Sequence, residues 1–422
     1  MEFADLLIEH AAELVTLDGS NDRPRTGQTL RELAIIADGA VAAADGEIVA
    51  VGSSAQVRDM VRLQDAATVL DATGKVVLPG FVDPHTHLVF GGSRADEFEA
   101  RLSGATYLEI AARGGGIMRT VAATRAADEE TLVDLGRARL DRMLRCGTTT
   151  AEAKSGYGLS VADELKQLRA IHRLSATHEV DLIPTALAGH AVPPEFSHDP
   201  EAYVELCARE ILPAVADEDL AEFCDAFCDV GAFTTEQGRR ILEAGAALGL
   251  PPKLHADEFG DRGGARLAAE VGAISADHLL HASDSGLAAM AEAKTLAVLL
   301  PGTALYLGLP YAAARRIIEL GVAPALGTDY NPGSSPTWSM PLAIGLACVG
   351  MKMLPAEAIA AATINAAWAI GAAEEIGSLA AGKVADMVIF DVHDHREIAM
   401  SAGALLPSQV IKRGRVVVDV IS

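Results

Sequence analysis

The chain has 422 residues, half of them hydrophobic and only 4% aromatic, and its formal charge at pH 7 is −24. That length allows one large domain with a smaller appendage, and a composition dominated by Ala, Val, Leu and Gly favours a parallel α/β protein. The negative charge argues against a nucleic-acid or anionic-membrane partner. Five cysteines without framework spacing are expected to be reduced thiols. Because the N-terminal stretch lacks a basic segment and a cleavage site, and no uncharged run could span a bilayer, we expect a cytoplasmic protein.

Both ends of the chain are predicted to form short strands. β-Branched runs interrupted by Asp-Gly, a hairpin signal, occur in residues 5–20, 33–53, 67–75, 385–392 and 408–420. The simplest interpretation pairs residues 1–75 with residues 380–422 in one small β-sandwich domain. Residues 76–379 would then form a second domain.

The middle of the chain alternates between apolar strand candidates and helical patterns. The strand candidates are residues 76–87, 147–155, 180–190, 226–233, 251–258, 273–281, 296–303 and 323–331. Helical patterns separate them, for example at residues 128–147, 161–178, 235–249 and 262–272. About eight βα units over roughly 250 residues predict a (β/α)8 TIM-like barrel. A doubly wound open sheet is the alternative, but the chain has no Walker motif, and residues 156–164 lack the third glycine of a dinucleotide-binding fingerprint.

Polar side chains gather at the ends of these predicted strands. Catalytic groups of TIM barrels lie at the C-terminal ends of the strands. Those ends carry His85, His87, Glu152, Lys154, His190, His255, Glu258, His278, His281 and Asp329. Six of the twelve histidines are in this set. His85 and His87 are two residues apart, so in a strand both rings would point to the same face.

This pattern is typical of a site for one divalent metal ion. Three imidazoles and one carboxylate suit Zn²⁺ or Fe²⁺, and such an ion lowers the pKa of water to about 7. A single histidine or aspartate has a simpler explanation, since His255 could be structural and Asp329 could be a turn residue. His85 and His87 together, directly after Asp-Pro at a strand end, favour metal binding instead.

These residues resemble the amidohydrolase superfamily. Its signature on the first strand is similar to residues 79–87, PGFVDPHTH, and its return to the small β domain is similar to residues 362–371 and 376–391. More narrowly, the chain resembles the branch that hydrolyses 4-imidazolone-5-propanoate to N-formimidoyl-L-glutamate. The segments that carry this likeness are residues 90–117, 151–159, 186–193, 254–259 and 326–337.

The resemblance implies a role for each matching residue. His85, His87, His255 and Asp329 would bind the metal, and Glu258, His278 and Asp329 would be catalytic. Arg94 would hold the propanoate carboxylate, a task that suits its planar guanidinium. The remaining substrate contacts would come from Tyr107, Tyr157, His190, Asn331, Gly333 and Ser334.

The number of metal ions stays open at this stage. Many members of the superfamily use a carboxylated lysine at a strand end to bridge two metals, and Lys154 lies at such an end. The narrower resemblance implies one metal, zinc or iron. The oligomeric state is open too, with a homodimer as one candidate.

The expected reaction is attack of metal-activated water on the ring carbonyl of a small anionic substrate. His278 or the metal would polarise the carbonyl, while Glu258 and Asp329 would move the proton to the departing ring nitrogen. A purine or pyrimidine deaminase on the same scaffold is the enzymatic alternative. The alternatives from another class are a non-catalytic scaffold of this fold and a metal-storage module. A metal-storage module leaves Glu258 and His278 unexplained.

Overall fold

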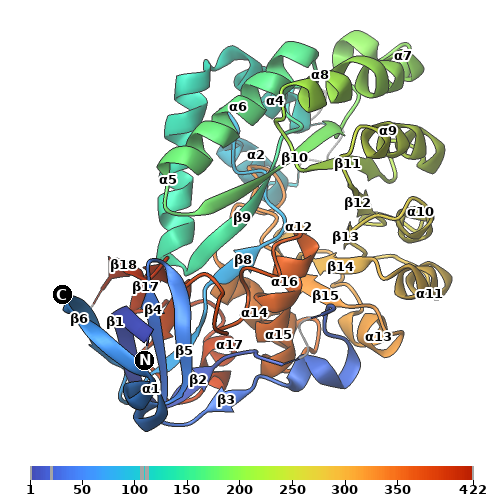
Figure 1. Cartoon of the computed structure of the whole chain (residues 1–422). Coiled ribbons are helices and arrows are strands. Elements are labelled where there is room, and N and C mark those ends of the chain that lie inside the picture. The colour runs from blue at the N-terminus through green and yellow to red at the C-terminus, as the bar shows by residue number, and fades with distance from the viewer. Residues whose placement is uncertain (1, 20–21, 105–108, 110–113, 421–422) are drawn as a thin grey trace.

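A computed structural model describes residues 2–19, 22–104, 109 and 114–420. Figure 1 shows a barrel of parallel strands with helices around it, and a smaller β domain beside the barrel that contains both chain ends. The barrel strands are β8 (Phe81–Asp83), β9 (Thr148–Lys154), β10 (Asp181–Gly189), β11 (Phe223–Cys228), β12 (Pro252–Ala256), β13 (Ser275–His278), β14 (Leu296–Leu299) and β15 (Pro324–Leu326). They are hydrogen-bonded in sequence order from β8 to β15, and every pair is parallel. The predicted (β/α)8 TIM-like fold is confirmed.

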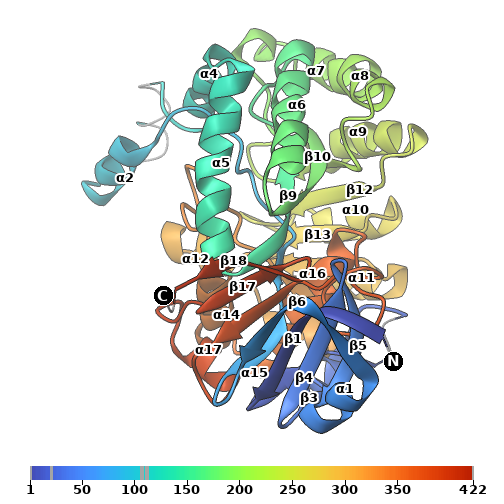
Figure 2. The same ribbon diagram turned by 60° about the vertical axis from the view of Figure 1, so that its left-hand side comes forward.

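Helices connect successive barrel strands, and the last three lead from β15 back to the small domain. They are α2 (Ala95–Leu102), α4 (Ile117–Ala126), α5 (Glu129–Arg145), α6 (Val161–Thr177), α7 (Pro200–Leu206), α8 (Leu212–Asp217), α9 (Thr235–Ala247), α10 (Gly264–Glu270), α11 (Asp284–Ala293), α12 (Pro301–Leu307), α13 (Ala314–Glu319), α14 (Met340–Val349), α15 (Pro355–Ala361) and α16 (Ile364–Ala369). Side-chain caps fix the N-termini of several helices. The Asp128 side chain accepts from Thr131 N before α5, and the Ser160 side chain accepts from Asp163 N before α6. Figure 2 shows α2 standing away from α4 and α5 at one side of the barrel.

Contacts between the first and last strands close the barrel. Asp329 N donates to His85 O at 3.0 Å, and His87 N donates to Tyr330 O at 2.9 Å. Below them, the Asp83 carboxyl accepts from Thr328 N at 3.0 Å and from Thr328 Oγ1 at 2.5 Å. We call this junction between residues 83–87 and residues 328–330 the seam. Its two segments carry three of the four predicted metal ligands.

The small domain is a sandwich of two sheets. One has the order β5–β4–β1–β6 and the other β18–β17–β16–β7–β2–β3. The strands of the two sheets are β1 (Glu2–Ala11), β2 (Glu13–Val15), β3 (Ile35–Ile36), β4 (Gly39–Ala44), β5 (Glu47–Ser53), β6 (Val61–Asp71), β7 (Val76–Pro79), β16 (Met387–Phe390), β17 (Gln409–Lys412) and β18 (Arg415–Asp419). Two short helices, α1 (Ser54–Met60) and α17 (Arg396–Met400), lie between them in the sequence. Side chains from both chain ends fill the space between the sheets, among them Leu6, Val41, Met387 and Ile411.

One predicted strand is two strands in the structure. Residues 76–87 were expected as the first barrel strand, but β7 pairs with β2 and β16 in the small domain, and the barrel begins at β8. Gly80 lies between the two strands. Glycine is needed there because a β-carbon would lie 2.3 Å from Thr149 Oγ1. The chain therefore passes from the small sheet to the barrel at Gly80, between β7 and β8. Periodicity cannot show this, because both strands are fully buried and apolar residues flank Gly80 on each side.

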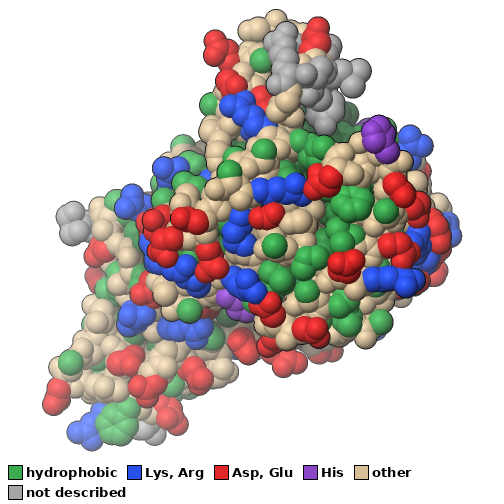
Figure 3. Space-filling view, turned by 90° about the horizontal axis from the view of Figure 1, so that it is seen from above, with side chains coloured by type: hydrophobic (Ala, Val, Ile, Leu, Met, Phe, Trp, Pro, Cys, Tyr) green, Lys and Arg blue, Asp and Glu red, His purple; other side chains and the backbone are tan. Residues whose placement is uncertain are grey.

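The surface is polar and mixed in charge. On the face seen in Figure 3, acidic and basic side chains are interspersed around a hydrophobic area. Among the described residues, no helix combines the length and apolar character that a bilayer span needs.

The seam leads to a prediction about stability. Thr328→Val keeps the shape of the side chain but removes the hydroxyl that donates to Asp83, so a buried carboxyl loses one partner. We expect the free energy of unfolding to fall by about 1–3 kcal/mol, measured as a lower urea midpoint. Thr328→Ser, which keeps the donor, is the control and should stay close to the parent. An unchanged midpoint in Thr328→Val would mean that this bond does not hold the seam.

Candidate metal centre and active site

The ends of three barrel strands bring four donor atoms together. His85 and His87 follow β8, His255 lies on β12 and Asp329 follows β15. His255 Nε2 lies 3.3 Å from His87 Nε2, and Asp329 Oδ1 lies 3.5 Å from both His85 Nε2 and His87 Nε2. All four side chains are buried. The four residues that the sequence predicts as ligands thus lie in one cluster, in which His85 joins two groups able to hold an ion, one with His87 and His255 and one with His278 and Asp329.

These separations fit a divalent metal ion. Ligand atoms around a tetrahedral ion with bonds of about 2.0–2.2 Å are separated by about 3.3–3.6 Å. His85 Nε2 is fully buried and has no hydrogen-bond partner among the described residues, as expected of a lone pair reserved for a cation. Burial lowers the pKa of His85 and His87, so both rings are neutral at pH 7 and able to coordinate. The donor set therefore suits zinc or iron.

Two buried aspartates orient the ligand rings from behind. Asp277 Oδ2 lies 2.6 Å from His85 Nδ1, and Asp225 Oδ2 lies 3.0 Å from His255 Nδ1. A carboxylate accepts from the Nδ1–H of a neutral imidazole, which leaves Nε2 as the lone-pair atom. The sequence pattern does not single out these two residues. The signal it offers is an aspartate inside a short strand, FCDAFC for β11 and SADH for β13.

Glu258 and His278 face each other beside the donor set. Their Oε2 and Nε2 atoms are 3.8 Å apart. Burial, reinforced by Asp329 and Asp229, raises the pKa of Glu258, whereas burial and His255 lower the pKa of His278. The backbone is in the left-handed region at His278, φ 76°, and at Asp329, φ 53°, a strain that is common at functional sites. Asp229, another residue that sequence analysis missed, accepts from Glu258 N at 2.5 Å and from Phe259 N at 2.9 Å and so anchors this loop.

Arg94 lies against the segment that follows Asp329. Its Nε donates to Glu97 Oε2 at 2.8 Å, which fixes the plane of the guanidinium. The guanidinium rests against the backbone of Gly333, where a β-carbon would lie 2.1 Å from Nη1. Arg94 and Asn331 both line a cavity of about 410 Å³. Glycine is therefore required at residue 333 if Arg94 is to keep this position.

Tyr157 and His190 lie next to the ligand rings. His190 stacks on His87 with ring centroids 5.1 Å apart, and Tyr157 lies 5.3 Å from His190. Burial lowers the pKa of His190 to about 3. The ring is therefore neutral, and since its Nδ1 is 2.9 Å from Gly156 O, Nδ1 carries the hydrogen and Nε2 is left as an acceptor. Tyr107, the other predicted substrate contact, lies outside the described residues.

Asn331 builds the loop that carries the other predicted substrate contacts. Its Oδ1 accepts from Gly333 N and Ser334 N, both at 2.8 Å. Its Nδ2 donates to Asp329 O at 2.7 Å and to Ser334 Oγ at 2.9 Å. The side chain is thus used within the loop, and it ties the backbone of Asp329 to the segment beside Arg94.

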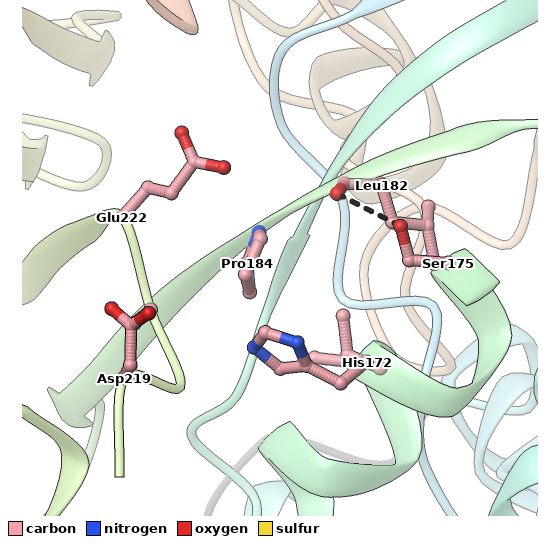
Figure 4. Close-up of a pocket in the computed structure, with 8 residues that line it drawn as sticks. His172, Ser175, Leu182, Pro184, Asp219 and Glu222 are labelled. Carbon is pink, nitrogen blue, oxygen red and sulfur yellow. Dashed lines mark hydrogen bonds between the residues drawn. The ribbon is translucent and has the colours of Figure 1, made fainter.

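A second cavity lies at the opposite ends of the strands. It has a volume of about 210 Å³ and is bordered by His172, Ser175, Asp219 and Glu222 (Figure 4). Its border also includes Leu182 near the start of β10 and Glu222 just before β11. Catalytic groups of TIM barrels lie at the C-terminal ends of the strands, so this cavity is separate from the centre described above.

Comparison with known proteins agrees with this geometry. Models of the Amidohydrolase family match residues 68–116 and 251–420. Solved structures with the same fold include an adenosine deaminase from Xanthomonas campestris with bound zinc, TM-score 0.71 at 21% identity over 99% of this chain and 94% of that one. Another is an atrazine chlorohydrolase from Arthrobacter aurescens with zinc, TM-score 0.68 at 17% identity over 98% and 95%. At such identities the likeness shows the fold alone.

Curated relatives are much closer in sequence. An imidazolonepropionase from Symbiobacterium thermophilum is 56% identical over 99% of this chain and 98% of its own length. One from Geobacillus kaustophilus is 54% identical over 98% of each chain. With identity of this order over nearly the full length, and with a histidine and aspartate cluster at the C-terminal ends of the barrel strands, this chain belongs to the imidazolonepropionase family of the amidohydrolase superfamily.

Proposed function

We propose that this protein hydrolyses 4-imidazolone-5-propanoate to N-formimidoyl-L-glutamate. The observation that carries the proposal is the buried donor set of three imidazoles and Asp329 beside Glu258 and His278, in a chain of this family. In the reaction a C–O bond forms between water and the ring carbonyl carbon, and the bond from that carbon to the adjacent ring nitrogen breaks. One water proton moves to the departing nitrogen, so the atoms of one water are consumed.

His85, His87, His255 and Asp329 would hold the divalent ion. When bound, the ion supplies hydroxide near neutral pH and polarises a carbonyl as a Lewis acid. Thr303 Oγ1 donates to Asp329 Oδ2 at 2.5 Å, which directs Oδ1 toward the imidazoles. Burial raises the pKa of Asp329 to about 6, whereas coordination of a divalent ion would favour the ionised carboxylate.

Glu258 is suited to carry the proton between water and the leaving nitrogen. A carboxyl group whose pKa is raised by burial can accept a proton and release it at neutral pH. Neutral His278, opposite Glu258, can donate a hydrogen bond to the oxygen on which negative charge develops. Asp229 holds the backbone of Glu258 in place during these steps.

Arg94 is the cation for the propanoate group. A protein with a formal charge of −24 repels anions at long range, so an anionic substrate needs a local positive charge. The planar guanidinium can pair with a carboxylate in a bidentate manner. His190 Nε2 and the Tyr157 hydroxyl are placed to contact the ring.

The metal identity, zinc or iron, and a count of one ion per chain are part of the proposal. So are a cytoplasmic location and the absence of nucleic-acid and membrane partners, which the charge supports. The purine or pyrimidine deaminase remains the alternative, because a zinc-containing adenosine deaminase shares the fold. Arg94, beside the cavity, favours a substrate with a carboxylate tail. A non-catalytic scaffold is disfavoured because all four ligand residues are present.

The direct test is hydrolysis of the imidazolone ring by the purified protein. Loss of ring absorbance should require metal: a chelator should abolish it, and one equivalent of Zn²⁺ or Fe²⁺ per chain should restore it. Adenosine and cytosine serve as control substrates and should not be deaminated. Ring opening that persists after the metal has been removed and counted as absent would contradict the proposed chemistry.

Glu258→Gln tests the proton carrier. The amide keeps the size of the side chain but cannot exchange a proton, so kcat should fall by about 10²–10⁴-fold. Metal content should stay at the parental value, since Glu258 is not one of the four donors. Turnover equal to the parent would remove Glu258 from the mechanism.

Arg94→Ala tests carboxylate recognition. We expect KM to rise strongly while kcat changes little, because the guanidinium binds a part of the substrate that does not react. Arg94→Lys, with a charge but no planar fork, should be intermediate. A fall in kcat at constant KM would assign Arg94 a different role.

A further inference from the structure

The barrel interior beneath the four donors holds charges in place of apolar side chains. Lys154, Lys253, Glu152, Asp225 and Asp277 are all fully buried there. Burying unpaired charges is costly, and such groups persist only where each has close partners. Two cations and three anions in one small volume therefore need a specific arrangement, and Lys154 is at its centre.

Lys154 contacts both carboxylates that orient the ligand rings. Its Nζ lies 2.9 Å from Asp225 Oδ2 and 3.7 Å from Asp277 Oδ2, and it pairs with Glu152 Oε2 at 2.9 Å. The same two Oδ2 atoms face the imidazoles of His255 and His85. Each carboxylate oxygen is thus shared between the ammonium group and a ligand ring.

We propose that Lys154 is a positioning residue for the metal centre. Its ammonium group holds the Asp225 and Asp277 carboxylates in the orientation that directs Nε2 of His255 and His85 toward the metal. Lys154 therefore acts through two carboxylates and two rings, and is neither a ligand nor a bridging carbamate. This inference rests on the proposed metal-dependent function.

The surroundings of Lys154 suit an ammonium group better than a carbamate. Nζ lies within 3.7 Å of the carboxylates of Glu152, Asp225 and Asp277, and a carbamate at this place would be repelled by all three unless two divalent ions lay between them. His85, Glu152 and Asp277 could by themselves hold a second ion. The ammonium group lies between Glu152 and Asp277, at 2.9 and 3.7 Å, and so takes the place of that cation.

Lys154→Met tests the proposal, because it keeps the length of the side chain and removes the charge. The affinity of the metal-free variant for Zn²⁺, measured by competition with a chromophoric chelator, should fall by about 10- to 100-fold, the effect typical of groups that orient ligands. The Co²⁺-loaded variant should also show an altered visible spectrum, since the ligand rings are less constrained. Parental zinc affinity with a parental cobalt spectrum would overturn the proposal.

Lys412→Met is the matched control. Lys412 is also buried and also bridges two carboxylates, with Nζ 2.7 Å from Asp181 Oδ2 and 2.5 Å from Asp386 Oδ2. It lies on β17 in the small domain, and Asp181 begins β10, at the end of the barrel away from the metal ligands. This variant should lose stability but keep parental zinc affinity. Equal losses of zinc affinity in both variants would mean that Lys154 acts only through general stability.

A double variant covers the case in which Lys154→Met does not fold. Lys154→Met with Glu152→Gln removes one charge of each sign, so the buried charges stay as nearly balanced as in the parent. Zinc affinity should remain low, because Asp225 and Asp277 still lack the ammonium group. Recovery of parental affinity would show that Lys154 only offsets buried charge. Since zinc binding is measured without substrate, parental protein that binds zinc but leaves the imidazolone intact would contradict the proposed function and not this inference.

Discussion

The pairing of residues 85–87 with residues 329–330 is the contact on which the rest of the structure depends. Two backbone hydrogen bonds join these segments, one from Asp329 N to His85 O and one from His87 N to Tyr330 O. They close the barrel between its first and last strands and at the same time bring Asp329 Oδ1 within 3.5 Å of both His85 Nε2 and His87 Nε2. A loss of this pairing would open the fold and disperse the ligands together, so stability and metal binding are coupled through one feature.

The site contains features that lower the stability of the fold, and the barrel around it offsets their cost. His278 and Asp329 have left-handed backbones, and charged side chains fill the barrel where aliphatic layers are usual. Each feature lowers stability by itself. The surrounding ladder of eight parallel strands and the apolar contacts behind it offset that cost.

The sequence predicts the fold and much of the centre for identifiable reasons. Strand and helix candidates alternate over the middle of the chain, and His85 and His87 show the two-residue spacing of a strand face. The roles of Asp225 and Asp277 could not be derived in this way, because periodicity shows that a residue points inward but not which ring it meets across the barrel. The division of residues 76–87 between two sheets was also hidden, since the segment is apolar on both sides of Gly80. In both cases the missing information is a tertiary contact between residues far apart in the chain.

The cavity beside Arg94 differs in charge from the chain as a whole. The chain carries a net charge of −24, yet the cavity beside Arg94 is lined by three arginines, Arg94, Arg139 and Arg142, and by no aspartate or glutamate among the described residues. Arg94 is paired with Glu97, but Arg139 is held by the carbonyl oxygens of Leu88 and Phe90, and Arg142 lies over the Trp338 ring. Neither Arg139 nor Arg142 forms an ion pair with a carboxylate of the described residues. Basic side chains are thus gathered along this cavity, which Tyr330 and Asn331 join to the segment after Asp329. Charges inside a low-dielectric cleft are screened less than those at the surface, so these arginines offset the negative charge of the chain locally.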